Sequence, residues 1–167
     1  PAYLLKSPAG RVPALEIDGE AVLETGAITE VLCERFSPDG LGRSAGHPER
    51  VQWLIWVHFA ETITQHSAAL TQQHVALRED HMRSPIVMKL EAARIGKCYA
   101  ALEARLTGRD YLLDGGFSAA DVSVGQAVYL ARYLPGMDVF GVSSQGPLVA
   151  VAAPALQQPD LLQPAGI

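Results

Sequence analysis

Basic residues are scarce in this chain, which has 13 Lys and Arg against 18 Asp and Glu, a net charge of −5 and an isoelectric point near 5.5. Such a charge disfavours nucleic acid and anionic membranes, so we expect neither as a partner. Cysteine is rare too. Cys33 and Cys98 match no metal-binding or redox spacing and fall within helical patterns. We expect buried thiols in a reducing, cytoplasmic compartment.

Long apolar runs are also missing. None approaches the ~20 residues that cross a bilayer, and no basic-then-apolar leader opens the chain. Hydrophobic residues nevertheless make up 49% of the sequence and charged residues 19%, a balance typical of a packed globular core. Four histidines are spaced by eight, eight and seven residues, so they drift around a helix and do not predict a metal site: His58, His66, His74 and His81.

The first 36 residues have the pattern of a β-hairpin followed by a helix. Residues 13–17 alternate in polarity, Asp18-Gly19 is a strong turn signal, and residues 21–23 form the returning strand. The period becomes helical from Gly26, and Thr25 stands at the N-cap position. The apolar face of this helix would comprise Ile28, Val31, Leu32 and Phe36.

The following residues predict a linker and three helices. Residues 37–47 are rich in Gly, Ser and Pro and lack periodicity. Pro48 can open a helix that extends to about Leu77. Its inward face would carry Val51, Leu54, Ile55, Phe59 and Ile63. Ser84-Pro85 is a good N-cap and N1 pair for a second helix, which keeps its register up to residue 107. Its register residues include Ile86, Leu90, Ala93, Lys97, Cys98, Leu102 and Leu106.

A capping box opens the third helix. Ser118 and Asp121 have the required spacing, Phe117 can act as the hydrophobic staple, and the helix should run to about Leu134. We interpret this box as structural and leave it out of any active site. From Met137 on, the sequence has no Lys or Arg and several prolines, which predicts irregular or loosely ordered structure.

Two motifs resemble the glutathione transferase family, in particular its bacterial, cytosolic members. The first is the Arg-Val-Pro-Ala-Leu … Glu-Thr-x-Ala-Ile run from Arg11 to Ile28, and the second is Tyr111-Leu112 followed by Phe117 to Asp121. The resemblance implies an α+β fold, in which a partial thioredoxin-like domain of hairpin plus helix precedes an all-α glutathione-transferase C-terminal domain. We expect a truncated glutathione-binding domain at 1–36, a linker at 37–47, a helical domain at 48–140 and an atypical tail at 141–167.

The resemblance also implies a glutathione site, glutathione being a co-substrate. Val12-Pro13 would be a cis peptide that presents the Val12 backbone to the cysteinyl part of the tripeptide. Glu24 would accept the γ-glutamyl ammonium, Thr25 would bind its carboxylate at a helix start, and Arg11 would pair with a carboxylate. Two of these roles have a structural alternative: the cis turn can serve folding alone, and Thr25 can act only as an N-cap. Glu24 discriminates better, since an acid before a helix start is not required.

The family's thiol-activating residue lies in a strand–helix–strand unit that we expect this sequence to lack, so the catalytic residue is unknown and the N-terminal domain is expected to be truncated. A single-base indel near Val149 to Ala152 is our hypothesis for the tail. The family reaction is attack of the glutathione thiolate on a small hydrophobic electrophile. We expect thiol activation to be absent here or to be supplied by residues outside this sequence. We also expect a homodimer. The alternatives are a non-catalytic binding module or an inactive relic of the same fold.

Overall fold

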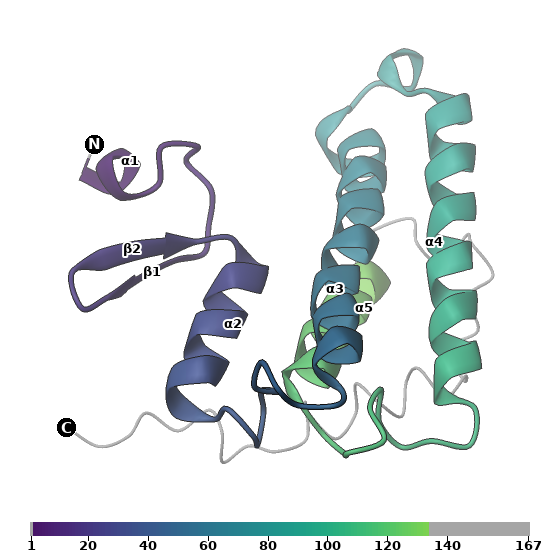
Figure 1. Ribbon diagram of the computed structural model, residues 1–167. Coiled ribbons are helices and arrows are strands. Elements are labelled where there is room, and N and C mark those ends of the chain that lie inside the picture. The colour runs from purple at the N-terminus through teal and green to yellow at the C-terminus, as the bar shows by residue number, and fades with distance from the viewer. Residues whose placement is uncertain (1, 134–167) are drawn as a thin grey trace.

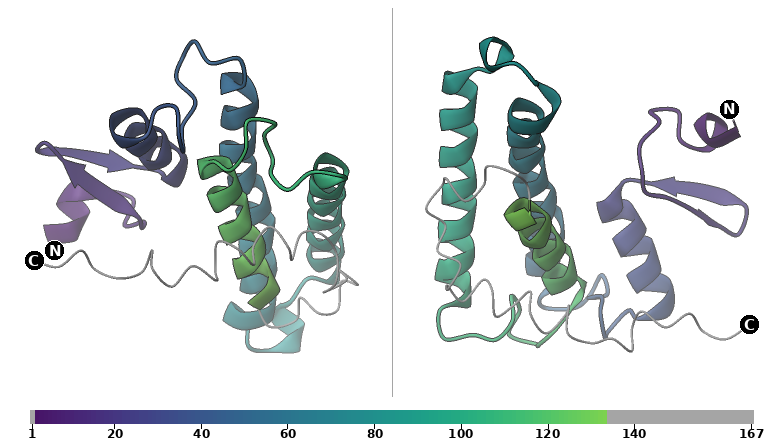
Figure 2. Two further views of the ribbon diagram at one scale, coloured as in Figure 1. Left: turned by 90° about the horizontal axis from the view of Figure 1, so that it is seen from below. Right: turned by 180° about the vertical axis from the view of Figure 1, so that it is seen from behind.

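The computed structural model describes residues 2–133. Its elements are α1 (Ala2–Lys6), β1 (Ala14–Ile17), β2 (Glu20–Leu23), α2 (Thr25–Phe36), α3 (Arg50–Thr71), η1 (Gln72–Ala76), η2 (Asp80–Met82), α4 (Pro85–Leu106) and α5 (Ala119–Tyr133). α1, the hairpin and α2 lie on one side of α3, and α4 lies on the other (Figure 1 and Figure 2). A two-stranded sheet therefore precedes a group of helices, and the α+β prediction is confirmed.

The hairpin forms as its turn residues predict. β1 and β2 pair antiparallel, with Ala14 opposite Leu23 and Ile17 opposite Glu20. Asp18 has φ 52° and Gly19 has φ 81°, and a two-residue type I′ turn requires positive φ at both positions. This short ribbon leads directly into α2, so it fixes the direction in which that helix leaves the sheet.

The predicted apolar face of α2 is wrong in part, since only Ile28 and Val31 of its four residues are half-buried. Phe36 is 71% exposed and Leu32 is exposed, whereas Gly26 and Cys33, seven residues apart, are buried. The reason is that α2 packs against α3, and it does so through a narrow strip that includes Gly26 and Cys33. Arg50 of α3 adds ion pairs to two carboxylates of α2, at 3.0 Å to Glu30 and 3.2 Å to Glu34.

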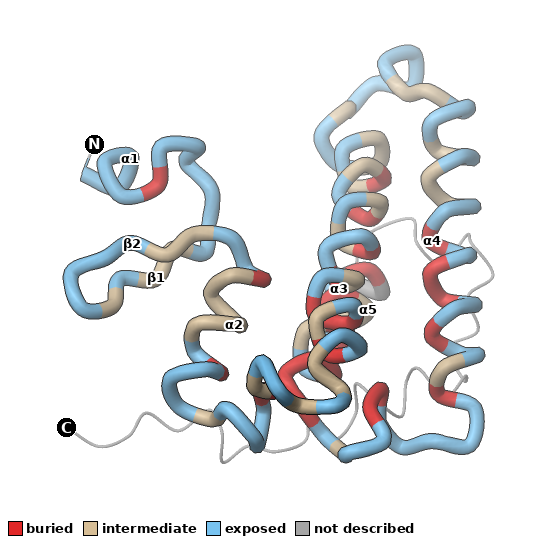
Figure 3. Tube along the Cα trace, in the orientation of Figure 1, coloured by how far each residue is buried: buried red, intermediate tan, exposed pale blue. Residues whose placement is uncertain are grey.

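α3 is the centre of the core, and its predicted inward face is also wrong in part. Val51 is 65% exposed and Ile55 is exposed, while Trp53 and Trp56 are buried. α3 contacts both α4 and α5, so it buries two neighbouring stripes where the periodicity suggested one. Figure 3 shows the buried residues gathered on the facing sides of these helices. The buried residues of α3 are Trp53, Trp56, Val57, Ala60, Ile63, Ser67 and Leu70.

Both thiols are buried, as predicted. Burial raises the pKa of Cys33 and of Cys98, because a thiolate is poorly solvated in an apolar environment. Burial also raises the pKa of Tyr99, in α4 beside Cys98, to about 12.

The segment between α2 and α3 is organised around a buried arginine. The Arg43 side chain is only 3% exposed, its Nε lies 3.3 Å from Glu49 Oε2, and its Nη1 donates to the carbonyls of Gly40 and Gly42. Glu49 in turn accepts from the backbone N–H groups of Asp114 and Gly115, at 2.8 and 3.1 Å. The residues predicted as a plain linker therefore tie the start of α3 to the loop before α5.

α4 begins as predicted, with Ser84 as N-cap accepting from the Val87 N–H at 3.3 Å and Pro85 as the first helical residue. Glu91 fastens α4 to α3, because its Oε2 lies 2.6 Å from Nδ1 of His66 on α3. Glu91 also forms an ion pair with Arg94 of its own helix. Burial alone would raise the pKa of Glu91, but the hydrogen bonds from His66 and Arg94 lower it overall.

The capping box at the start of α5 is confirmed. Asp121 is 1% exposed and its Oδ2 accepts from the Ser118 N–H at 2.9 Å, while its Oδ1 accepts from the Leu112 N–H at 2.8 Å. The Ser118 hydroxyl accepts from the Ala120 N–H at 3.2 Å. Phe117 contacts the Tyr111 ring edge-on. One carboxylate thus anchors both the helix start and the loop that leads to it.

The predicted end of this last helix at Leu134, the tail at 141–167 and the indel hypothesis lie outside the described residues. The division into segments at 36, 47 and 140 stays a prediction. Within residues 2–133, no helix combines the length and the apolar character that crossing a membrane requires.

Candidate functional site

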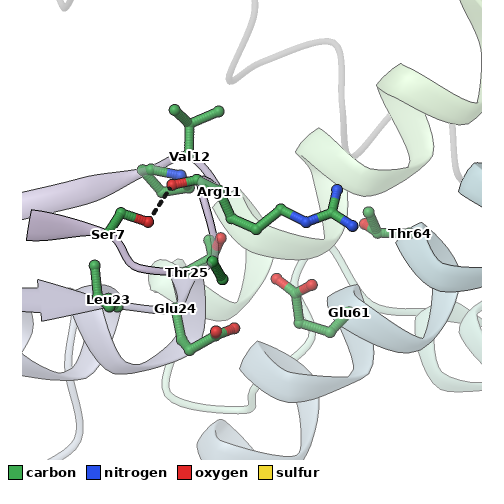
Figure 4. Close-up of a pocket in the computed structure, with 10 residues that line it drawn as sticks. Ser7, Arg11, Val12, Leu23, Glu24, Thr25, Glu61 and Thr64 are labelled. Carbon is green, nitrogen blue, oxygen red and sulfur yellow. Dashed lines mark hydrogen bonds between the residues drawn. The ribbon is translucent and has the colours of Figure 1, made fainter. Parts of the chain in front are cut away.

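A pocket of about 410 Å³ lies where the hairpin and the start of α2 face α3. Figure 4 shows its walls: one comes from the segment before β1 and from the β2–α2 junction, and the other from α3. Its lining residues are Ser7, Ala9, Arg11, Val12, Pro13, Leu23, Glu24, Thr25, Glu61 and Thr64. All five residues predicted for a glutathione site are among them, so the structure brings them together around one cavity.

The turn before β1 is built on a cis peptide. The Val12-Pro13 bond is cis, as predicted, and Val12 is 81% exposed. The preceding carbonyl, that of Arg11, accepts from the Ser7 hydroxyl at 2.9 Å and from the Tyr3 hydroxyl. Because the Ser7 side chain is buried, this turn is held from beneath and leaves Val12 open at the mouth of the pocket.

The start of α2 differs from the prediction by one residue. Glu24 is the N-cap and makes no side-chain cap hydrogen bond, whereas Thr25 is the first helical residue. The assignment of Thr25 as N-cap is therefore wrong. The reason is the backbone of Glu24, whose φ of 69° lies in the left-handed region that non-glycine residues rarely adopt. Such a conformation costs about 1–3 kcal/mol and marks candidate functional positions.

This junction leaves polar groups available to a ligand. Both Glu24 and Thr25 are exposed to the pocket, and the first backbone hydrogen bond of the helix runs from the Ile28 N–H to the Glu24 carbonyl. The N–H groups that precede Ile28 in the helix have no intrahelical acceptor. They carry the positive end of the helix dipole, which suits a carboxylate.

Five lining residues were not predicted from the sequence, and three of these have polar side chains: Ser7, Glu61 and Thr64. Ser7 precedes the turn, and the other two lie one turn apart on α3. Helical periodicity predicts that Glu61, which follows the buried Ala60, lies outside the core. Periodicity does not predict that this face of α3 turns toward α2. In Figure 4 the Arg11 side chain extends from the turn toward α3, so the pocket combines one cation with the carboxylates of Glu24 and Glu61.

The lining of the pocket offers hydroxyl groups but neither a thiol nor a phenol. Its ten lining residues include no cysteine and no tyrosine. Among the three hydroxyls that do line it, Ser7 donates to the Arg11 carbonyl. Cys33 and Cys98 lie elsewhere, buried and with raised pKa.

The sequence matches two family descriptions. Residues 1–40 match the N-terminal domain of glutathione S-transferase, and residues 65–158, more than half of the chain, match its C-terminal domain. The chain belongs to the glutathione S-transferase family. The resemblance seen in the two sequence motifs is thereby confirmed, as is the fold class: a thioredoxin-like N-terminal part precedes a helical C-terminal domain.

Individual relatives agree with the family. Glutathione S-transferase GST-4.5 of Xanthomonas campestris is 25% identical over 156 residues, which cover 86% of this chain and 70% of that protein. Protein LigF of Sphingobium sp. is 26% identical over 147 residues, covering 70% of this chain and 57% of LigF. The chain thus spans little more than half the length of LigF. The crystal structure of the glutathione transferase URE2P6 from Phanerochaete chrysosporium, in complex with oxidized glutathione, superposes with a TM-score of 0.79 at 23% identity, over 95% of this chain and 73% of that one.

Proposed function

We propose that the chain binds glutathione in the pocket between the cis-proline turn, the start of α2 and α3, as a glutathione transferase does. The observation that carries the proposal is the convergence of Arg11, Val12, Pro13, Glu24 and Thr25 on one cavity. The binding of oxidized glutathione by URE2P6, which shares the fold, supports it.

In this proposal each group matches one part of the tripeptide. The exposed backbone of Val12 pairs with the cysteinyl unit as an added strand would. The Glu24 carboxylate accepts the γ-glutamyl ammonium, and the hydroxyl and N–H of Thr25 bind its carboxylate at the positive end of α2. Arg11 pairs with a glutathione carboxylate.

We further propose that this chain holds glutathione without activating its thiol. Two observations support this: the lining includes no cysteine or tyrosine, and the hydroxyl of its one serine, Ser7, donates to the Arg11 carbonyl. The family reaction, conjugation of the thiolate to a small hydrophobic electrophile, would then be slow. A binding protein without catalysis is the second candidate function, and the same observation favours it.

Isothermal titration with glutathione tests the binding proposal. Glu24→Gln removes the charge that faces the ammonium and should weaken binding at least about tenfold, since a charge-assisted hydrogen bond contributes roughly 1.5–3 kcal/mol. Glu103→Gln is the matched control, because Glu103 is an exposed carboxylate of α4 outside the pocket lining. Equal affinities of the two variants would count against the assignment.

Conjugation of 1-chloro-2,4-dinitrobenzene tests the second part. We expect binding without measurable acceleration over the uncatalysed reaction. A rate enhancement would show that a group in the chain activates the thiol.

We also propose a homodimer, a cytoplasmic location and segment bounds at 36, 47 and 140. Measurement of molecular size, cell fractionation and limited proteolysis, respectively, would test these three proposals.

A further inference from the structure

An imidazole of α3 lies directly against the backbone of the first turn of α2. A methyl group at Gly26 would have its carbon 2.7 Å from His58 Cε1 and 2.8 Å from Nδ1, closer than carbon atoms approach in folded proteins. Gly26 is buried beneath this ring. Only glycine therefore lets His58 occupy its place, although Gly26 lies inside a helix, where alanine is otherwise favoured.

The other edge of the same ring is held by α2 as well. His58 Nε2 lies 3.0 Å from Oε1 of Glu30, four residues after Gly26. Because a carboxylate only accepts hydrogen bonds, Nε2 is the nitrogen that carries the proton. The second oxygen of Glu30 accepts from Arg50 at 3.0 Å, and Arg50 Nη1 donates to the Arg43 carbonyl at 2.9 Å. His58 thus contacts α2 at two points one turn apart.

These contacts join the two helices that contribute to opposite walls of the pocket. Glu24 and Thr25 immediately precede Gly26, and Glu61 follows His58 by three residues on α3. The distance across the pocket therefore depends on how closely the first turn of α2 sits against α3. Toward the other end of α2, the buried Cys33 and the ion pair between Arg50 and Glu34 fasten the helix, whereas His58 contacts its pocket end.

We propose that His58 is a positioning residue for the proposed glutathione pocket. Its imidazole docks on Gly26, is fixed by Glu30, and sets the separation between the Glu24–Thr25 wall and the α3 wall. The inference rests on the proposed function for its ligand. The packing of His58 against Gly26, on which the inference also depends, is present in the structure without any ligand.

The test is a double-mutant cycle read as glutathione affinity. Gly26→Ala forces the ring away from Glu30 and should raise the Kd about fivefold, and His58→Ala should raise it by a similar factor. The double variant should bind no more weakly than His58→Ala alone, because alanine at 26 has nothing to displace once the ring is gone. Gly96→Ala is the control, since a Cβ there meets nothing within 4 Å, and its Kd should equal that of the wild type.

A wild-type Kd for Gly26→Ala, or losses that simply multiply in the double variant, would overturn the proposal. So would a change in the midpoint of unfolding without a change in Kd, which is what a purely structural contact gives.

A second readout needs no ligand. The amide of Ile28 donates to the Glu24 carbonyl, so its hydrogen exchange reports on the first turn of α2. His58→Ala should accelerate that exchange severalfold, whereas Gly96→Ala should not. If the wild type fails to bind glutathione but this acceleration is seen, the proposed function fails while the positioning role of His58 stands. Unchanged exchange in His58→Ala contradicts the positioning role whatever the affinities.

Discussion

Replacing Asp121 by alanine should remove a large share of the stability of the helical part of the chain. The carboxylate is 1% exposed and accepts from the backbone N–H groups of Leu112 and Ser118 and from the Ser118 hydroxyl, at 2.8, 2.9 and 3.2 Å. Alanine leaves two buried N–H donors without their acceptor. Since each orphaned donor costs about 1–3 kcal/mol, we expect a loss of about 4 kcal/mol in the free energy of unfolding.

Urea unfolding followed by tryptophan fluorescence measures this loss, because both tryptophans lie in the buried core. Asp121→Asn keeps one accepting oxygen and should lose about half as much. Asp110→Ala, an exposed aspartate of the preceding loop, should stay within about 0.5 kcal/mol of the wild type. An Asp121→Ala variant within about 1 kcal/mol of the wild type would refute the reasoning.

Three further predictions concern groups that packing shields, fully or in part, from solvent. Cys33 and Cys98 should react with a thiol reagent at pH 8 far more slowly in the folded protein than in urea, because burial raises both pKa values; equal rates would contradict this. The lowered pKa of Glu91 contributes stability above its unfolded pKa of about 4.3 that is lost as the pH falls through the folded value, so Glu91→Gln should flatten the stability–pH curve in that range. Arg43→Met breaks the buried pair with Glu49 and should lower the free energy of unfolding by about 3 kcal/mol, measured in urea.

Features set by a few neighbouring residues could be predicted from the sequence. The Asp18-Gly19 turn, the Ser84-Pro85 start of α4 and the box of Ser118 and Asp121 all form as expected. Each depends on a local backbone requirement: positive φ, a restricted φ, or a side-chain oxygen within reach of a free N–H. Such requirements are met by the same residues whatever the rest of the chain does.

Features that depend on a packing partner could not be predicted from the sequence. Periodicity finds an apolar stripe on α2 and on α3, but only the contacts among α2, α3, α4 and α5 decide which stripe is buried. Phe36 and Val51 are exposed for this reason. The burial of Arg43 likewise depends on the distant Gly115 and Gly116 loop, to which no local pattern points.

The candidate site contains features of both kinds: local features that the sequence predicts, and features that depend on a packing partner. The cis-proline turn and the Glu24-Thr25 pair carry a recognisable motif, and they line one pocket. Glu61 and Thr64 complete that pocket from α3, and the sequence gives them no mark that distinguishes them from other exposed helical residues. The shift of the N-cap from Thr25 to Glu24 follows from a positive φ at a glutamate, which residue type does not predict.

Amide chemical shifts recorded during titration with glutathione test the central claim most directly. If the pocket binds the tripeptide as proposed, the largest changes should fall on the amides of Val12, Thr25 and Gly26 and saturate together. Changes confined to other residues, or none at millimolar glutathione, would contradict the account.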